Sequence, residues 1–391
     1  MHVEIKSCVI RDIKICFVND LSSIFFVWLV GGFPNGWIEM VTLKNLIFLI
    51  AVYLSYCKGG ETRTEEAIND RPIIGVLSQE QSRHLHSKFP HENYTSYIGA
   101  SYVKDVEAAG ARVVPILIGK KRAYYEDLLK KINGVLLPGG ATYFNQSNGF
   151  ADAGEYIYEI AKEMNNAGDY FPIFGTCLGF ELLIILASGR GSKENRVQCY
   201  SFKNLPLNFT KDFRTSKMFK DASNDVIHIL SNEDVTVNAH QFCIIDENLF
   251  SHNLTKDWHI TSHSKDDNGT SFIASVEHIR YPFYGVQFHP EKSAFEWKLS
   301  KSYAHTMNAI KANRYFMDFF VNECRKNNHT FSSVKEENEY LIYNYMPKFT
   351  GALGSAYQQC YFFEPRGEES EEVLINNNKH DMYESYKTDL L

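Results

Sequence analysis

Cys177 stands in a sequence pattern that is typical of a nucleophile. Residues 171–186 read as a short apolar strand, a Gly-x-Cys-x-Gly turn and an apolar helix. A residue on such a turn is held in a strained conformation above the sheet edge, and Gly175 and Gly179 leave room for the helix to pack closely. The helix dipole is expected to lower the pKa of the thiol. The other interpretation is a structural thiol, because free cysteine is among the most buried residue types.

A second segment contains the groups that a thiol nucleophile needs. Residues 284–292 (YGVQFHPEK) end an apolar run with His289, and an acid, Glu291, follows two residues later. A nucleophilic thiol requires a base, and the base requires a carboxylate that orients its ring. Side chains two residues apart in a strand point to the same side. We therefore expect Glu291 to orient His289.

The elements around these residues predict an α/β fold. Apolar strand patterns alternate with amphipathic helix patterns, which indicates a doubly wound, mostly parallel sheet flanked by helices. In such sheets the ligand crevice lies at the carboxyl ends of the strands, where Cys177 and His289 fall. Shorter β-like runs in residues 195–285 predict antiparallel additions, and residues 301–324 predict a long closing helix. The strands are expected at 71–77, 111–117, 132–137, 225–230, 235–240 and 271–276, and the helices at 97–110, 124–131 and 152–166.

A third candidate group is the tripeptide Pro138-Gly139-Gly140, which ends the strand predicted at 132–137. Such tripeptides are commonly simple turns. Acyl transfer, however, needs N–H donors aimed at the developing oxyanion, and a glycine-rich loop together with the residue after the nucleophile can supply them. We therefore assign the N–H groups of Gly139 or Gly140 and of Leu178 to an oxyanion hole.

The composition bounds the remaining possibilities. The chain has 391 residues, 44% of them hydrophobic, and can bury one large core or two modest ones. A formal net charge of −7 gives no basic footprint for nucleic acid. No Cys-x-x-Cys or His-Glu-x-x-His spacing suggests a metal site, and no cofactor is expected.

The N-terminus is typical of a targeting sequence. Residues 40–57 have a basic n-region and an apolar run too short for a stable membrane span, which predicts a signal peptide; an uncleaved signal anchor is the alternative. Met40 is then the real or alternative start, and residues 1–39 are not expected in the mature protein. Residues 58–70 are a polar linker, and residues 366–391 are an acidic tail predicted to be disordered.

Glycosylation sequons and cysteines also favour the secretory pathway. After Cys8, Cys16 and Cys57, five cysteines remain, and an odd count in an oxidising compartment leaves at least one free thiol. If Cys177 is free, Cys199, Cys243, Cys324 and Cys360 form two bridges in one of three ways, or none. Six Asn-x-Ser/Thr sequons follow the signal peptide, and they lie at Asn93, Asn145, Asn208, Asn253, Asn268 and Asn328.

The cysteine turn with its His-Pro-Glu partner resembles the Cys-His-Glu triad of the class I glutamine amidotransferase superfamily. Within it, residues 71–365 resemble the γ-glutamyl hydrolase family. The matching phrases lie at residues 97–104, 134–140, 175–181, 205–210, 284–292, 320–329 and 357–364. The Gly-x-Cys-x-Gly turn is typical of the whole superfamily, whereas the other matching phrases indicate the γ-glutamyl hydrolase family within it.

The resemblance implies roles for residues by position. Cys177 would be the nucleophile, His289 the general base and acid, and Glu291 its orienting acid. His240 falls where the family has another active-site histidine, whereas Phe242 departs from the tryptophan of relatives. The family further implies a thioester acyl-enzyme, poly-γ-glutamyl folates and antifolates as substrates, a lysosomal or secreted location, and a homodimer.

Two other classes of function share this fold. A glutaminase subunit would use the same triad to deliver ammonia to a synthetase, but it would carry neither a signal peptide nor glycans. A catalytically silent binding protein would normally lack Cys177, His289 or Glu291, and all three are present.

Overall fold

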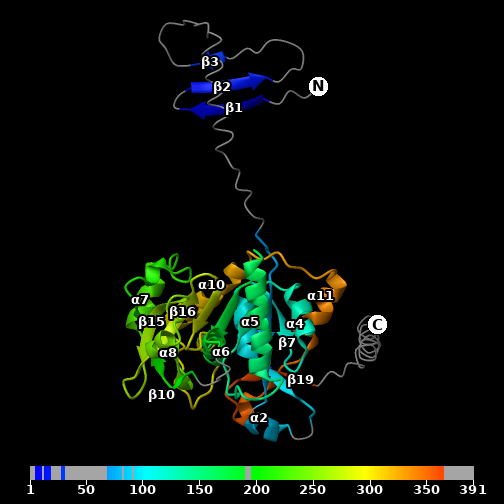
Figure 1. Ribbon diagram of the computed structural model, residues 1–391, viewed down its shortest axis with the longest axis vertical. Coiled ribbons are helices and arrows are strands. Elements are labelled where there is room, and N and C mark those ends of the chain that lie inside the picture. The colour runs from blue at the N-terminus through cyan, green and yellow to red at the C-terminus, as the bar shows by residue number, and fades with distance from the viewer. Residues whose placement is uncertain are drawn as a thin grey trace, which may run out of the picture. The chain divides into compact units, whose positions relative to one another are not determined.

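A computed structural model describes residues 68–364 except 82, 90–91 and 190–194, together with three N-terminal strands. The chain divides into two units, residues 1–65 and 66–391. The first contains an antiparallel sheet of β1 (Ile5–Ile10), β2 (Ile13–Val18) and β3 (Trp28–Val30) (Figure 1). The signal peptide, the linker up to residue 67 and the tail predicted at 366–391 lie outside the described residues, so those predictions stand as predictions.

The second unit is built on an eight-stranded mixed sheet, as predicted. Five neighbouring strands, β17, β9, β8, β4 and β7, are parallel, and β16, β15 and β12 extend the sheet in antiparallel fashion. In sheet order the strands are β12 (Asn208–Phe209), β15 (Trp258–Lys265), β16 (Ser271–His278), β17 (Phe283–Val286), β9 (Ile173–Thr176), β8 (Gly134–Leu137), β4 (Ile73–Leu77) and β7 (Arg112–Ile116).

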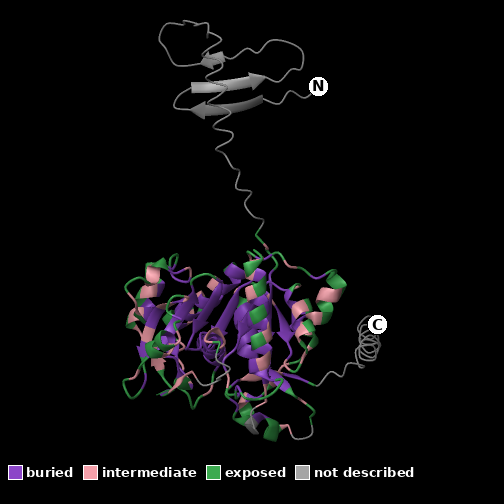
Figure 2. Ribbon diagram, viewed as in Figure 1, coloured by how far each residue is buried: buried purple, intermediate pink, exposed green. Residues whose placement is uncertain are grey.

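Helices cover both faces of this sheet, and each face has its own buried core (Figure 2). Alternation along β4 shows the division, because Ile74 and Val76 face one core and Ile73 and Leu77 the other. The first core includes α3 (Ala100–Ala108), α7 (Asn224–Asn232) and α10 (Met307–Cys324). The second includes α4 (Arg122–Leu129), α5 (Phe150–Asn166), α6 (Leu178–Ala187) and α8 (Asp246–Ser251).

A smaller sheet corrects one predicted boundary. Residues 97–99, expected to begin a helix, belong to β6 (Ser96–Gly99), because this segment pairs with β19 (Gln359–Phe363) and the helix begins only at Ala100. The other strands of this sheet are β5 (Gln79–Glu80) and β18 (Lys348–Phe349). The remaining short helices are α2 (Arg83–Lys88), α9 (Lys292–Phe295), α11 (Val334–Tyr340), η1 (Phe213–Thr215), η2 (Ile342–Asn344) and η3 (Gly351–Leu353).

The predicted strand at 225–230 is wrong, since this segment forms helix α7. The side chain of Ser223 caps the helix by accepting from the Val226 N–H at 3.2 Å, and Val226, Ile229 and Leu230 are buried at helical spacing. The expected antiparallel additions are otherwise present. Two ribbons pair β10 (Val197–Ser201) with β14 (His240–Cys243) and β11 (Asn204–Leu205) with β13 (Thr236–Val237).

The sequence left open whether Cys199, Cys243, Cys324 and Cys360 form two disulfides or none, and the structure contains one. Cys199 and Cys243 form a disulfide that joins β10 to β14, with Cα atoms 5.6 Å apart. Cys177, Cys324 and Cys360 are buried free thiols. One bridge therefore forms, rather than two or none, and Cys177 stays reduced. Within the described residues no helix is long and apolar enough to cross a membrane.

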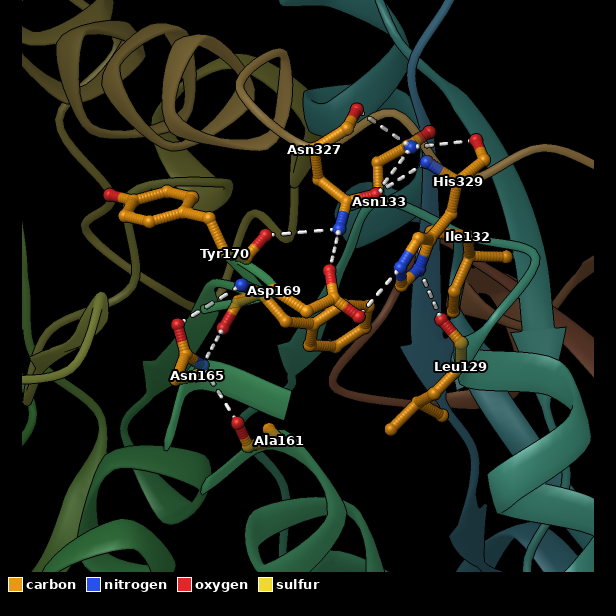
Figure 3. Close-up of polar contacts among 10 residues, drawn as sticks. Leu129, Ile132, Asn133, Ala161, Asn165, Asp169, Tyr170, Asn327 and His329 are labelled. Carbon is orange, nitrogen blue, oxygen red and sulfur yellow. Dashed lines mark hydrogen bonds and ion pairs between the residues drawn. The ribbon is translucent and has the colours of Figure 1, made fainter. Parts of the chain in front are cut away.

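A buried polar network fixes the edge of the sheet at which β8 and β9 begin (Figure 3). Asn133 donates to Asn327 Oδ1 at 2.9 Å and accepts from the Ile73 N–H at 2.8 Å. The ring of His329 lies between Asp169, 2.9 Å from Nε2, and the Leu129 carbonyl, 2.8 Å from Nδ1. This network ties the end of α10 to the sheet. Asn327 and His329 thus have a structural role at the edge opposite to Cys177.

Candidate active site

Cys177 lies at the junction of β9 and α6 in a backbone conformation rare for a non-glycine residue. Its φ is 49° and its ψ −107°, and its N–H donates to the Val286 carbonyl of the neighbouring strand at 2.7 Å. The close packing predicted for the flanking glycines is confirmed, because a Cβ on Gly179 would lie 2.0 Å from the Leu137 carbonyl oxygen. Such strain is kept where a side chain must be aimed.

His289 and Glu291 form the expected pair, but not for the expected reason. His289 Nδ1 lies 2.8 Å from Glu291 Oε1. Strand β17 already ends at Val286, so strand alternation does not orient the pair. Instead, the His289 N–H donates to the Val237 carbonyl at 2.8 Å, and Glu291 is the N-cap residue of α9. Since an ionised carboxylate can only accept, Nδ1 carries the proton and Nε2 is left as a base.

Gly139 lies between Cys177 and His289, the candidate nucleophile and the candidate base. A Cβ built on Gly139 would lie 2.6 Å from His289 Cε1 and 3.1 Å from Cys177 Cβ, so both residues border the glycine loop. The hydroxyl of Tyr102, on α3, accepts from the Gly139 N–H at 2.9 Å and lies 3.2 Å from His289 Nδ1. Three strand ends and one helix therefore converge on one buried site.

The thiol does not show the lowered pKa expected from the helix dipole. Cys177 is only 4% exposed, and burial raises the pKa of its thiol; the nearby carboxylates of Glu181 and Glu291 raise it further. The Leu178 N–H and Lys292 lower the pKa of the thiol, but by less than burial and the two carboxylates raise it. In this closed site the resting thiol is neutral, and it needs a base to become a nucleophile.

Burial and pairing set the charges of the base and its neighbours. Burial lowers the pKa of His289, although Glu291 favours its charged form, so the imidazole rests neutral. Burial opposes the charge on Glu291, yet contacts with His289 and Lys292 lower the pKa of Glu291. Lys292 Nζ lies 3.7 Å from Glu291 Oε1. The site thus contains a neutral thiol and imidazole beside a buried carboxylate–ammonium pair.

Sequence reasoning missed three polar residues, Gln287, Glu181 and Arg196, that form a connected group beside Cys177. Gln287 Nε2 lies 3.8 Å from Cys177 Sγ and donates to Glu181 Oε1 at 3.0 Å. The buried Glu181 carboxylate also pairs with Arg196. Gln287 could have been predicted from the sequence, because it lies only two residues before His289. No local pattern pointed to Arg196, which lies beyond the end of α6.

His240 is buried, and its ring nitrogens face residues other than Cys177, His289 and Glu291. Its Nε2 lies 3.2 Å from Asn238 Oδ1 and its Nδ1 3.3 Å from the Cys199 carbonyl. Burial lowers the pKa of His240 to about 4, and nearby His289 lowers it as well. Phe242 is partly exposed, and its ring centroid lies 4.2 Å from the Arg196 guanidinium carbon.

We expect the substitution Gly139→Ala to abolish most activity while the protein still folds. The added methyl would meet His289 Cε1 at 2.6 Å and the Tyr102 hydroxyl at 2.7 Å. Overpacking of this kind costs about 1–3 kcal/mol of stability, and a shift of about 1 Å in a reacting group can lower the rate by about 10². Steady-state kinetics with thermal unfolding as a control test this. Full activity would contradict the placement of Gly139.

The fold and the site together define a class: an α/β protein with a mostly parallel sheet and a buried cysteine on its strand–helix turn. The family model of peptidase C26 matches residues 72–291. The chain belongs to the peptidase C26 family and is thus a hydrolase of the γ-glutamyl hydrolase type.

The relatives match over nearly their whole length. The γ-glutamyl hydrolase of Mus musculus is 40% identical over 328 residues, which cover 83% of this chain and 100% of the relative. That of Homo sapiens is 39% identical over 296 residues, 75% of this chain and 90% of the relative. The γ-glutamyl hydrolase B of Dictyostelium discoideum is 35% identical, over 80% of this chain and 87% of the relative.

Proposed function

We propose that this protein hydrolyses γ-glutamyl amide bonds, with poly-γ-glutamyl folates and antifolates as substrates and Cys177 as the nucleophile. The observation that carries the proposal is the convergence of Cys177, the His289–Glu291 pair and the glycine loop at the carboxyl edge of the parallel strands. Membership of the peptidase C26 family and the γ-glutamyl hydrolase relatives support the substrate class.

Acylation begins with transfer of the Cys177 proton to His289 Nε2. The thiolate attacks the carbonyl carbon of the γ-amide, and the carbonyl oxygen becomes an oxyanion. His289 then donates the proton to the departing amino group, the C–N bond breaks and a thioester forms. Because both groups rest neutral, the thiolate forms only when His289 accepts the proton of Cys177. Glu291 keeps the Nδ1 proton in place and stabilises the imidazolium that forms.

Deacylation uses the same residues in reverse. His289 removes a proton from water, and the resulting hydroxide attacks the thioester carbonyl. The C–S bond then breaks, and the proton returns to the Cys177 sulfur. We assign the N–H groups of Gly140 and Leu178 to the oxyanion hole in both steps, since the Gly139 N–H already donates to Tyr102. Buried His240 serves as an auxiliary residue that borders the substrate.

The pH dependence follows from the direction of the His289 pKa. Catalysis needs a neutral His289, and burial lowers its pKa from the ordinary value of 6.5. Activity is therefore lost only as the pH falls through a value below 6.5, which suits an acidic compartment. A profile of kcat/KM against pH is expected to show its acid limb centred below 6.5. A midpoint at or above 6.5 would contradict the neutral pair.

The proposed reaction is tested against its alternative with one protein preparation. The protein is given a γ-linked oligoglutamyl folate in one reaction and free glutamine in another. We expect glutamate or oligoglutamate from the first and little ammonia from the second. The reverse outcome would favour the glutaminase subunit, which the γ-glutamyl hydrolase relatives do not favour.

The location and assembly of the protein are part of the proposal. All six sequon asparagines are exposed, which supports glycosylation in the secretory pathway and a lysosomal or extracellular location. We propose that residues 71–365 form the hydrolase domain of a homodimer that binds neither nucleic acid nor a cofactor. Endoglycosidase treatment of the secreted protein should increase its electrophoretic mobility, whereas unchanged mobility would argue against this route.

A further inference from the structure

We propose that Gln79 and Tyr357 are positioning residues for the oxyanion hole. Their side chains hold the peptide between Gly139 and Gly140 so that the Gly140 N–H faces the reacting carbonyl beside Cys177. This inference rests on the proposed function and names the device that aligns its site. We call the pair the Gln79–Tyr357 clamp.

Hydrogen bonds hold both peptide groups that flank Gly139. Gln79 Nε2 donates to the Pro138 carbonyl at 3.1 Å and to the Gly139 carbonyl at 3.2 Å. The Tyr357 hydroxyl donates to the same Gly139 carbonyl at 3.0 Å. The two clamp residues come from β5 and from the segment before β19, which lie far apart in sequence. Distant parts of the fold therefore meet on one loop peptide.

The direction of the Gly140 N–H follows from planar peptide geometry. The described chain has no cis peptide bond, and in a trans peptide the carbonyl and the following N–H point in opposite directions. The clamp fixes the Gly139 carbonyl on its own side, so the Gly140 N–H points away from the clamp. The Gly139 N–H cannot take this role because it donates to Tyr102. Gly139 itself borders Cys177 and His289, so the adjacent N–H is close to the reacting centre.

The Gln79 side chain is packed tightly against the glycine loop, and its unpaired buried oxygen lowers the stability of the fold. A Cβ on Gly140 would lie 1.8 Å from Gln79 Oε1, so the amide fills the space against the loop. Gln79 is 2% exposed, and its Oε1 has no hydrogen-bond partner within the described residues. A buried, unpaired acceptor destabilises a fold, and an apolar side chain would fill the same space without that cost. This loss of stability indicates that Gln79 serves through the two hydrogen bonds that its Nε2 donates to the loop.

The test compares hydrolysis with a reaction at Cys177 that forms no oxyanion. Full-length Gln79→Leu and Tyr357→Phe are assayed for kcat and KM on a γ-linked oligoglutamyl folate. In parallel, the rate of Cys177 alkylation by iodoacetamide is followed by peptide mass spectrometry; in this reaction the thiolate displaces iodide. The matched control is Tyr97→Phe, which removes a buried hydroxyl from the same aromatic cluster, with ring centroids 6.1 Å from Tyr357.

We expect kcat to fall about 10- to 100-fold in Gln79→Leu and by a smaller factor in the nearly isosteric Tyr357→Phe, less than the loss of a whole donor would cost. KM and the alkylation rate should stay within about twofold, and the control should match wild type on both measures. Unchanged kcat in both variants would overturn the clamp, and so would a parallel fall in alkylation. A wild-type protein that alkylates at Cys177 but leaves the substrate intact would instead contradict the proposed function.

Discussion

Cys177→Ala is expected to lower γ-glutamyl hydrolysis by about 10⁴-fold or more, to a level set by the remaining oxyanion donors. The substitution removes the sulfur that forms the acyl-enzyme, and no other described thiol can replace it, because Cys324 and Cys360 are buried elsewhere in the fold. Cysteine and alanine share the Cβ that strains the backbone at residue 177, so the substitution adds no new strain, and only the packing of the buried sulfur is lost. Initial rates and thermal unfolding separate the two effects.

The matched control for this prediction is Cys324→Ala. Cys324 is a fully buried free thiol at the end of α10, and its removal leaves a cavity but no missing nucleophile. We expect Cys324→Ala to keep nearly full activity per folded molecule. Substantial turnover by the Cys177 variant, or equal losses in the two variants, would contradict the assignment of Cys177.

His289→Gln is expected to lower kcat by about 10²- to 10⁴-fold. Because burial raises the pKa of the Cys177 thiol, the nucleophile does not form by itself near neutral pH and depends on His289 to accept its proton. The loss should therefore shrink as the pH rises and hydroxide forms the thiolate. Glutamine is similar in size and keeps a polar group beside Glu291, but it cannot accept and return a proton.

The control for His289 is His278→Gln. His278 is another buried histidine whose pKa burial lowers to about 4, and its Nδ1 accepts from the Arg280 and Tyr281 N–H groups. That variant should lose stability and keep its rate per folded molecule. The account predicts a pH-dependent rate loss for His289→Gln alone, and a pH-independent loss in both variants would contradict it.

The local motifs predicted the core of the site because they depend on short-range geometry. Cys177 lies on its predicted turn, and His289 and Glu291 are only two residues apart, so their proximity could be predicted from the sequence, although the bond from His289 to Val237 that helps to hold the pair could not. The alternation of strands and helices likewise predicted the parallel part of the sheet. The apolar run at 225–230 fits both a strand and a helix, and the Ser223 cap is the local feature that favours the observed helix α7.

The remaining parts of the site depend on long-range packing. Gln79, Tyr102 and Tyr357 reach the glycine loop from three distant elements, and no local chemical pattern assigns them to the site, although Tyr102 and Tyr357 lie in phrases that resemble the family. The pKa of Cys177 was predicted in the wrong direction for a similar reason. The helix dipole can be inferred from the turn, whereas burial by the surrounding loops cannot, and burial is the larger effect.

The central claim is that the Cys177 site cleaves γ-glutamyl amide bonds. Its most direct test is the release of glutamate from two oligoglutamyl folates that differ only in linkage, γ or α, by wild type and Cys177→Ala. The account predicts that wild type cleaves the γ-linked compound, leaves the α-linked isomer largely intact, and loses its activity with Cys177. Equal cleavage of both isomers, no cleavage of either, or an active Cys177→Ala would contradict it.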